Sequence, residues 1–476
     1  MAEILLTHSY FLHFDPKQLK SGTPYAPLAT LYAAAVLKQH AFDVAFHDNM
    51  FALAANEIAG NIGAEKPSLF VIYDDGFNYL TKMCLTNMRD AAFEMIALAK
   101  KAGCTVAVSS SDSTDHAASY LAHGADYIIT GEGEQTVLEL SEFLIRNKGA
   151  AEHIPGLVYL KEGQALHTAK RENRRELDEL PLPAWELLDA APYKQMWLSQ
   201  KGYFSMNMVT TRGCPFKCNW CAKPIYGNRY NSRSPEQVLA EIKLLKQQFH
   251  IDHIWFADDI FGLKPGWVKR FSELLKKDQV KIRFKIQSRV DLLLEEDTTI
   301  HLANAGCEEV WVGAESGSQK ILDAMDKGTK VEQIAQATAL MKQHGIKPCF
   351  FLQFGYPGED RADIEQTIKM VETLRPHDIG ISVSYPLPGT NFYANVKSQL
   401  SVKQNWTDSD ELLVMFNGTF SAAFYKHLQR LVHYKFRRWK AIDKWNTKHG
   451  LKNIPVLLYR TIQVMLARQQ LKKHAA

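Results

Sequence analysis

Three cysteines lie within eight residues of this 476-residue chain and are its strongest sign of chemistry. Cys214, Cys218 and Cys221 form a C-x3-C-x2-C pattern inside the segment TTRGCPFKCNWCAKP. Thiolates are soft ligands that bind iron–sulfur clusters, zinc or copper(I). Three thiolates leave one iron of a four-iron cluster without a protein ligand, so a small molecule can bind there. A structural zinc site needs a fourth ligand, which Asn219 and Trp220 cannot supply, so a distant histidine would have to complete it.

The cysteine motif follows directly on the first strand of a regular strand–helix alternation. Short apolar runs predict strands over 206–211, 253–257, 283–287, 309–314, 348–354 and 379–385. Helical segments separate them, for example 235–249, 266–277 and 331–344. Six strand–helix units in tandem predict a partial (β/α)6 barrel, and in barrels of this type the chemistry lies at the carboxyl ends of the strands.

The motif, with the aromatic Trp220 before its last cysteine, resembles that of the radical SAM superfamily. Further segments resemble the family's second- to fifth-strand signatures and its closing segment, in the family's order. They are FADDIFGL (256–263), SRVDLL (288–293), VGAESGSQKILDAMDKG (312–328), FGYPGE (354–359) and SYPLPGTNFY (384–393).

The resemblance implies that the three cysteines hold a 4Fe-4S cluster whose fourth iron is chelated by S-adenosylmethionine (SAM). Electron transfer would cleave SAM to a 5′-deoxyadenosyl radical that abstracts hydrogen from a substrate. SAM-binding positions carried over to this chain are Glu315, Trp220, Asp258, Arg289 and Gly355. Simpler interpretations stay open: a cap for the following loop at Asp258, a surface ion pair at Arg289 and a tight turn at Gly355. No residue is assigned to the catalytic step itself.

The first 150 residues alternate in the same way. Strands are predicted over 3–7, 43–47, 69–73, 105–109 and 127–130, with helices over 27–40, 87–102 and 134–147. Near-continuous apolar runs of this length are typical of strands buried on both faces. The pattern predicts a doubly wound, flavodoxin-like parallel sheet, which binds ligands outside the carboxyl ends of its strands.

This N-terminal half resembles the cobalamin-binding-domain branch of the radical SAM superfamily, on the stretches 24–49 and 123–144. The resemblance places Gly131, Glu132 and Gly133 at the cobalamin, although a plain turn would also use these glycines. The Asp-x-His-x-x-Gly loop of other cobalamin proteins is missing from the sequence. The alternative is therefore a domain that keeps the fold without the cofactor.

Cobalamin would make methyl transfer to an unactivated carbon the expected reaction. Without cobalamin, the candidates are cyclisation, rearrangement or oxidation by a radical SAM enzyme. A third hypothesis, of another class, is a non-catalytic iron–sulfur or zinc-binding redox protein. The substrate is expected to be a small molecule or natural product, and the resemblance implies an electron donor such as flavodoxin or ferredoxin.

The composition, with 46% hydrophobic and 23% charged residues, is typical of a folded protein with two or three domains. We expect four parts: a cobalamin-binding-like domain (1–150), a hairpin and extended linker (151–200), the barrel (201–400) and a helical basic region (401–476). No secretory signal is recognised, so a metal or redox site is favoured over a disulfide framework, and a cytoplasmic location is expected. Cys307 and Cys349 are expected to be buried core thiols.

Residues 424–476 contain 13 lysines and arginines but one acid, Asp443. Aromatic residues at three-residue steps, including Phe436 and Trp439, predict a helix with one aromatic face. Such a helix can dock on the acidic remainder of the chain or lie on an anionic membrane, and docking is favoured. Nucleic acid is not expected as a partner, because no recognition module is visible.

Overall fold

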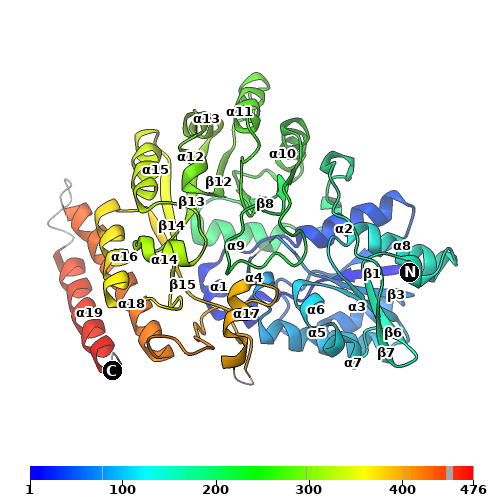
Figure 1. The fold of residues 1–476 in the computed structure, drawn as a ribbon. Coiled ribbons are helices and arrows are strands. Elements are labelled where there is room, and N and C mark those ends of the chain that lie inside the picture. Colours follow the sequence, from blue (N-terminus) through cyan, green and yellow to red (C-terminus); the bar gives the residue numbers. More distant parts are fainter. Residues whose placement is uncertain (78, 296, 401–402, 446–453, 475–476) are drawn as a thin grey trace. The chain divides into compact units, whose positions relative to one another are not determined.

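The computed structural model describes residues 1–77, 79–295, 297–400, 403–445 and 454–474 (Figure 1). The chain divides into two compact units. The first unit comprises Met1–Pro215, Ala222–Phe284 and Asn405–Glu411, and the second comprises Phe216–Cys221, Lys285–Gln404 and Leu412–Ala476. Each unit is described by itself below.

The N-terminal sheet of the first unit has the strand order β2-β1-β3-β4-β5-β6-β7. The first five strands pair in parallel, which confirms the flavodoxin-like order predicted from the sequence. Every residue of the central strand, LFVIY, is buried, as its uninterrupted apolar run requires. The strands are β1 (Ile4–Thr7), β2 (Val44–Phe46), β3 (Leu69–Tyr73), β4 (Thr105–Ser109), β5 (Tyr127–Ile129), β6 (Leu157–Lys161) and β7 (Gln164–His167).

Helices cover both faces of this sheet, with α2 and α8 on one face and α3 and α5 on the other (Figure 1). This two-sided cover is what buries the apolar strands. The helices of the first unit are α1 (Pro16–Ser21), α2 (Leu28–Gln39), α3 (Ile58–Glu65), α4 (Tyr79–Lys82), α5 (Thr86–Lys101), α6 (Ser111–Asp115), α7 (Ala117–Ala122), α8 (Glu134–Arg146), α9 (Ala191–Lys201), α10 (Pro235–Phe249) and α11 (Trp267–Lys277).

The interval 151–200 was only partly predicted. Its hairpin exists as β6 and β7, and β6 pairs antiparallel with β5 at the edge of the N-terminal sheet. The extended linker is wrong, because residues 191–201 form the helix α9, with Pro192 in its first turn and Gly202 as a left-handed C-cap. Tyr193 and Trp197 on α9 are buried and donate hydrogen bonds to Asp48 and to the Pro24 carbonyl.

The second sheet has the strand order β8-β11-β12-β13-β14-β15, the chain order that a partial barrel of strand–helix units requires. Parallel pairing of β8 with β11, and of β14 with β13 and β15, confirms the predicted fold class. The strands are β8 (Ser205–Met208), β11 (His253–Phe256), β12 (Arg283–Ser288), β13 (Cys307–Glu315), β14 (Lys347–Phe354) and β15 (Asp378–Val383). Cys307 and Cys349 on these strands are buried, as predicted.

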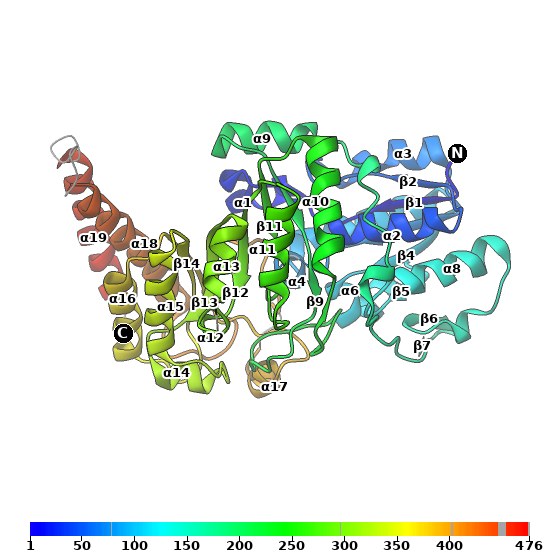
Figure 2. The same cartoon turned by 90° about the horizontal axis from the view of Figure 1, so that it is seen from above.

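In the second unit, α13 and α15 pack on β13 and β14 (Figure 2), and α18 packs on α16, on β15 and on α19. The helical character predicted for the C-terminal region is confirmed by α18 and α19. The helices of this unit are α12 (Val290–Leu293), α13 (Thr298–Ala305), α14 (Gln319–Ala324), α15 (Val331–Gln343), α16 (Arg361–Leu374), α17 (Asn391–Val396), α18 (Ala422–Trp445) and α19 (Ile454–Lys473).

Candidate functional site

The chain leading into the cysteine motif is fixed by Asp258, which follows β11. Its carboxylate accepts hydrogen bonds from the backbone N–H groups of Thr210 (2.7 Å) and Thr211 (2.8 Å), and from both threonine hydroxyls. Burial raises the pKa of Asp258 to about 6, although the bonds from Thr210 and Thr211 oppose that shift. These four donors engage the carboxylate, so Asp258 holds the approach to the cysteine motif, and its contact with SAM stays a prediction.

The base of the cysteine loop is closed by a short antiparallel ladder of β9 (Thr211–Arg212) and β10 (Asn231–Ser232). Gly213 follows β9 with φ +77°, and a Cβ at this position would lie 2.2 Å from the Arg229 carbonyl oxygen. Only glycine permits this approach of the two sides of the loop. The Lys223 ammonium donates to the Cys214 carbonyl (2.9 Å), so the loop is also tied across its interior.

Arg212, two residues before Cys214, joins the cysteine loop to the N-terminal sheet. Its guanidinium forms ion pairs with Glu132 and with Glu134 (2.7 Å), and all three side chains are buried. The rings of Tyr32, Phe77 and Tyr226 surround it at 5.3–5.7 Å. Burial lowers the pKa of Arg212, but Glu134, Tyr226 and Glu132 outweigh that effect and raise it. No local pattern in the sequence indicated a role for this arginine, because its partners lie about 80 positions away.

The glycine loop after β5 was expected to contact cobalamin, and its residues have different environments. Glu132 is engaged by Arg212 and by the N–H of Arg174. Gly133 is required for packing, since a Cβ there would lie 2.7 Å from the Tyr73 hydroxyl. Gly131 has φ +71° and open space, because the nearest atom to its Cβ position is 3.9 Å away. Of these three positions, Gly131 therefore best fits a close approach to a ligand.

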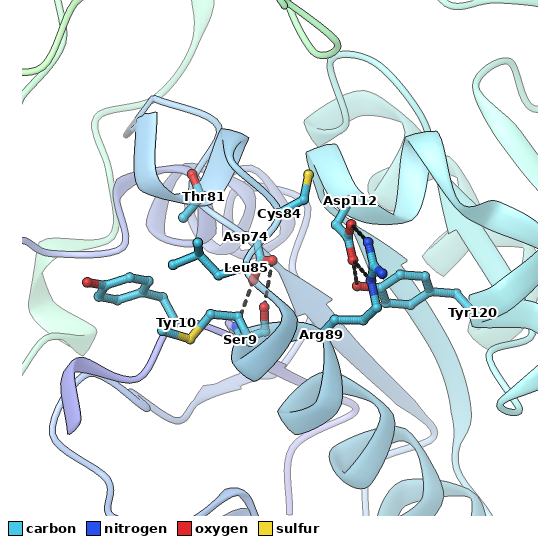
Figure 3. Close-up of a pocket in the computed structure, with 10 residues that line it drawn as sticks. Ser9, Tyr10, Asp74, Thr81, Cys84, Leu85, Arg89, Asp112 and Tyr120 are labelled. Atoms are coloured by element: carbon cyan, nitrogen blue, oxygen red, sulfur yellow. Dashed lines mark hydrogen bonds and ion pairs between the residues drawn. The ribbon is translucent and has the colours of Figure 1, made fainter. Parts of the chain in front are cut away.

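The carboxyl ends of β1, β3 and β4 surround a small polar cavity of about 20 Å³ (Figure 3). Asp74 accepts hydrogen bonds from the N–H (2.6 Å) and hydroxyl (2.7 Å) of Ser9. Asp112 pairs with Arg89 and accepts from the Tyr120 hydroxyl (2.7 Å). The volume suits a water molecule at most, so this cavity does not enclose a large ligand.

In the second unit, the segment between the last two cysteines is clamped at Asn219. Its side-chain amide donates to the Ala324 carbonyl (2.7 Å) and accepts from the Tyr356 hydroxyl (2.8 Å). Its backbone bonds to Met325 and Phe392. Trp220 packs against the buried cluster that includes Met325 and Tyr356, which fixes the strip of chain carrying Cys218 and Cys221.

Glu315, at the end of β13, is buried and paired with Lys327 at 2.8 Å. A Cβ at Gly313 would lie 2.4 Å from the Glu315 carboxylate, so this glycine makes room for the pair. The Lys327 ammonium lies 5.9 Å from the Trp220 ring centre. Burial lowers the pKa of Lys327, but Glu315 and then Cys218 outweigh that effect and raise it. Lys327 lies in the segment 312–328, but no pattern in the sequence indicated a role for this residue.

Arg289 does form an ion pair, but its side chain is buried, so the interpretation as a surface ion pair is wrong. Its guanidinium is bidentate on Asp291 and donates to the Lys327 carbonyl (3.0 Å). It also stacks on the ring of Phe216 in the cysteine motif, 3.7 Å from the ring centre. Arg289 therefore supports both the motif and the turn that presents Lys327.

Gly355, after β14, has φ +78° and donates its N–H to the Glu359 carboxylate (2.6 Å). A Cβ here would lie 3.1 Å from the Tyr425 ring, so packing and turn geometry both require glycine. Burial raises the pKa of Glu359 to about 8, against the opposing bond from Gly355. The tight-turn interpretation of Gly355 is confirmed, and its contact with SAM stays a prediction.

The three motif cysteines are half-buried. Cys214 belongs to the first unit, and Cys218 and Cys221 belong to the second. Over the described parts of the chain, no three His, Cys, Asp or Glu side chains are grouped to hold a metal ion. The three thiols still fit the predicted 4Fe-4S cluster, because they lie on one loop that is anchored at its base and at Asn219. Their cluster ligation stays a prediction.

Comparison with known proteins supports the resemblance noted in the sequence. Residues 208–371, which contain the cysteine loop and strands β11 to β14, match the model of the Radical SAM superfamily. This part of the chain therefore carries a radical SAM domain. An uncharacterised methyltransferase of Pyrococcus horikoshii is 30% identical over 59% of this chain and 60% of its own length. The anaerobic magnesium-protoporphyrin IX monomethyl ester cyclase of Rubrivivax gelatinosus is 27% identical over 58% of this chain and 50% of its own length. The aligned region thus spans about half to three-fifths of these relatives.

Similarity in fold extends beyond the matched domain. The cobalamin-dependent SAM radical enzyme OxsB, solved with aqua-cobalamin bound, aligns with 98% of this chain and 72% of its own, with a TM-score of 0.74 and 19% identity. The two proteins therefore share the N-terminal sheet as well as the barrel strands.

Proposed function

We propose that this chain is a cobalamin-dependent radical SAM enzyme that transfers a methyl group to an unactivated carbon of a small-molecule or natural-product substrate. The observation that carries the proposal is the buried Arg212, which joins the glycine loop of a flavodoxin-like domain to the cysteine loop within one compact unit. Fold similarity to a cobalamin-dependent enzyme along nearly the whole chain supports the cofactor assignment.

Cys214, Cys218 and Cys221 would hold a 4Fe-4S cluster, which when bound supplies the electron that cleaves SAM. Around it, the protein supplies position and charge. Asp258 and Arg212 fix the approach to Cys214, and Asn219 fixes the strip carrying the other two cysteines.

Glu315 and Lys327 would meet the charged amino-acid portion of SAM, because a buried ion pair can offer a carboxylate to an ammonium and an ammonium to a carboxylate. Arg289 donates a hydrogen bond to the carbonyl of Lys327 and so holds the turn that carries this lysine. Gly131 would let the backbone approach cobalamin closely. These are roles in binding and orientation, and no side chain is assigned to the transfer itself.

Methyl transfer is favoured because the Pyrococcus relative is named a methyltransferase. Cyclisation is the second candidate, since the Rubrivivax relative is named a cyclase. An electron donor such as flavodoxin or ferredoxin would reduce the cluster. A reducing cytoplasm would suit the three half-buried cysteine thiols. Among the helices described, none is both long and apolar enough to cross a membrane.

The proposal is tested on protein purified without oxygen and reconstituted with iron, sulfide and cobalamin. Wild-type protein should form 5′-deoxyadenosine from SAM with a reductant and should retain corrinoid through gel filtration. The Cys218→Ala variant should lose 5′-deoxyadenosine formation, whereas Cys104→Ala, which changes a buried thiol outside the motif, should keep it. Zinc in place of iron, or equal activity in both variants, would refute the cluster assignment; iron without retained corrinoid would refute cobalamin.

A further inference from the structure

Helix α19 has two apolar faces, and α18 covers one of them. Val464, Ala467 and Leu471 pack against Leu431 and Tyr434 of α18. The other apolar side chains are solvent-exposed, for example Leu458 (60%), Ile462 (54%) and Leu466 (57%). The full exposed set is Ile454, Val456, Leu458, Tyr459, Ile462, Met465 and Leu466.

Most of these exposed residues share one side of the helix. Leu458, Ile462, Met465 and Leu466 follow the i, i+4, i+7, i+8 spacing of a single helical face. The buried Val464, by contrast, lies on the side that α18 covers. A contiguous apolar face of this kind on a protein surface marks a contact with a partner or a membrane.

Positive charge accompanies this face. Lys472 and Lys473 are exposed and lie seven residues beyond Met465 and Leu466, so they extend the same face at its C-terminal end. Over residues 424–476, 13 lysines and arginines stand against a single acid. Two copies of so basic a hairpin would repel each other, which disfavours a second copy of the chain as the partner.

We propose that the exposed face of α19, defined by Leu458, Ile462, Met465 and Leu466, lies on the surface of an anionic lipid bilayer. A helix whose second apolar face is already packed can bind there through its exposed face, with the apolar side chains at the boundary of the acyl chains while Lys and Arg reach the phosphates. Of the described helices, none is both long and apolar enough to cross a membrane, so α19 would lie along the membrane surface.

The two roles weighed for the basic region thus fall on different helices. Docking is carried out by α18, whose Phe436 and Trp439 are buried in the second unit. The guanidinium of Arg375 lies 5.5 Å from the centre of the Trp439 ring, and Lys440 bonds to the His377 carbonyl (2.9 Å). With α18 anchoring the hairpin to the body, α19 can present its other face outward.

The test is co-sedimentation of the full chain with phosphatidylcholine vesicles, with and without phosphatidylglycerol. Wild-type protein should bind the anionic vesicles, and added salt should weaken binding. The Ile462→Asp/Leu466→Asp variant should lose at least about tenfold in partitioning, since it puts charge into the apolar boundary. The matched control, Leu53→Asp/Leu160→Asp, changes two exposed leucines elsewhere and should bind as wild type does.

Circular dichroism would establish that each variant keeps its helix content, which is expected because the substituted side chains are already exposed. Equal binding by both variants, or no binding by the wild type, would overturn the proposal. So would a wild-type dimer in sedimentation velocity that Ile462→Asp/Leu466→Asp converts to a monomer, because the face would then belong to a second copy. Vesicle binding needs neither cluster nor cobalamin, so its failure would leave the proposed function untouched.

Discussion

Replacing Arg212 with methionine is the most direct test of how the cysteine loop is held. The guanidinium is 4% exposed and neutralises Glu132 and Glu134, which are 7% and 4% exposed as side chains. The Arg212→Met variant keeps much of the side-chain volume but leaves two buried carboxylates facing each other. Breaking a buried ion pair from one side costs about 3–5 kcal/mol, a large part of the 5–15 kcal/mol that typically stabilises a folded domain.

The variant should also respond to pH in a defined direction. Burial already raises the pKa of Glu132, and Arg212 is the largest influence that lowers it. Without Arg212 this pKa rises further, so the folded protein holds a proton that the unfolded chain releases. Stability should therefore be greatest at low pH and be lost as pH rises through the raised pKa. Adding Glu132→Gln and Glu134→Gln to the Arg212→Met variant should restore part of the lost stability.

Urea unfolding of cluster-free protein measures the effect. With a slope of about 3 kcal/mol per molar urea, the midpoint of the first unit should fall by about 1 M or more. The matched control is Arg270→Met, which breaks a surface pair with Glu236 whose side chains are 53% and 52% exposed, and it should cost at most about 1 kcal/mol. Iron bound after reconstitution provides a second readout, since the loop carrying Cys214 begins two residues further on.

Equal urea midpoints for Arg212→Met and Arg270→Met would refute this reasoning, because burial would then not increase the free-energy cost of breaking the ion pair. A large loss of stability with unchanged iron loading would refute a narrower point: the network would stabilise the first unit without positioning the cysteine loop.

Three further predictions follow from single contacts. Gly213→Ala should lower iron loading, because its Cβ would lie 2.2 Å from a carbonyl oxygen. The control Gly227→Ala, with φ +67° and no atom within 4 Å of its Cβ position, should cost only about 1 kcal/mol of strain. Equal iron content in the two variants would contradict this prediction. Lys327→Met should weaken SAM binding in equilibrium dialysis and destabilise the second unit by about 3–5 kcal/mol, because Glu315 is left buried without its cation; unchanged stability would show that the pair is dispensable. Burial raises the pKa of Glu359 from 4.5 to about 8, so its contribution to wild-type stability should fall by at most about 5 kcal/mol as pH rises through that interval. Glu359→Gln should remove this pH dependence, as measured by urea unfolding at several pH values. An equally steep loss of stability in the variant would refute the assignment.

Local sequence was enough to predict the parallel strands of both sheets. The strand LFVIY is uniformly apolar because it is buried on both faces, so its run and its flanking turns marked it without tertiary information. The cysteine motif could be recognised from the sequence alone, because ligands that share one loop are close in sequence. The helix α9 was missed although Pro192 and Gly202 marked its ends, since the prolines before it favoured an extended linker.

Partners distant in sequence could be identified only from the tertiary structure. Arg212 meets carboxylates about 80 positions away, and no local pattern distinguishes it from a surface arginine. Gly133 looked like a ligand-binding glycine, yet the hydroxyl of Tyr73 on another strand explains it. Helix α19 carries apolar residues around its circumference, and only its packing on α18 shows which face is left exposed. Sequence by itself therefore determined the parallel strands and indicated the chemistry expected of the cysteine loop. The tertiary structure decided which charges are paired and which surfaces stay uncovered, because both depend on contacts between residues far apart in the chain.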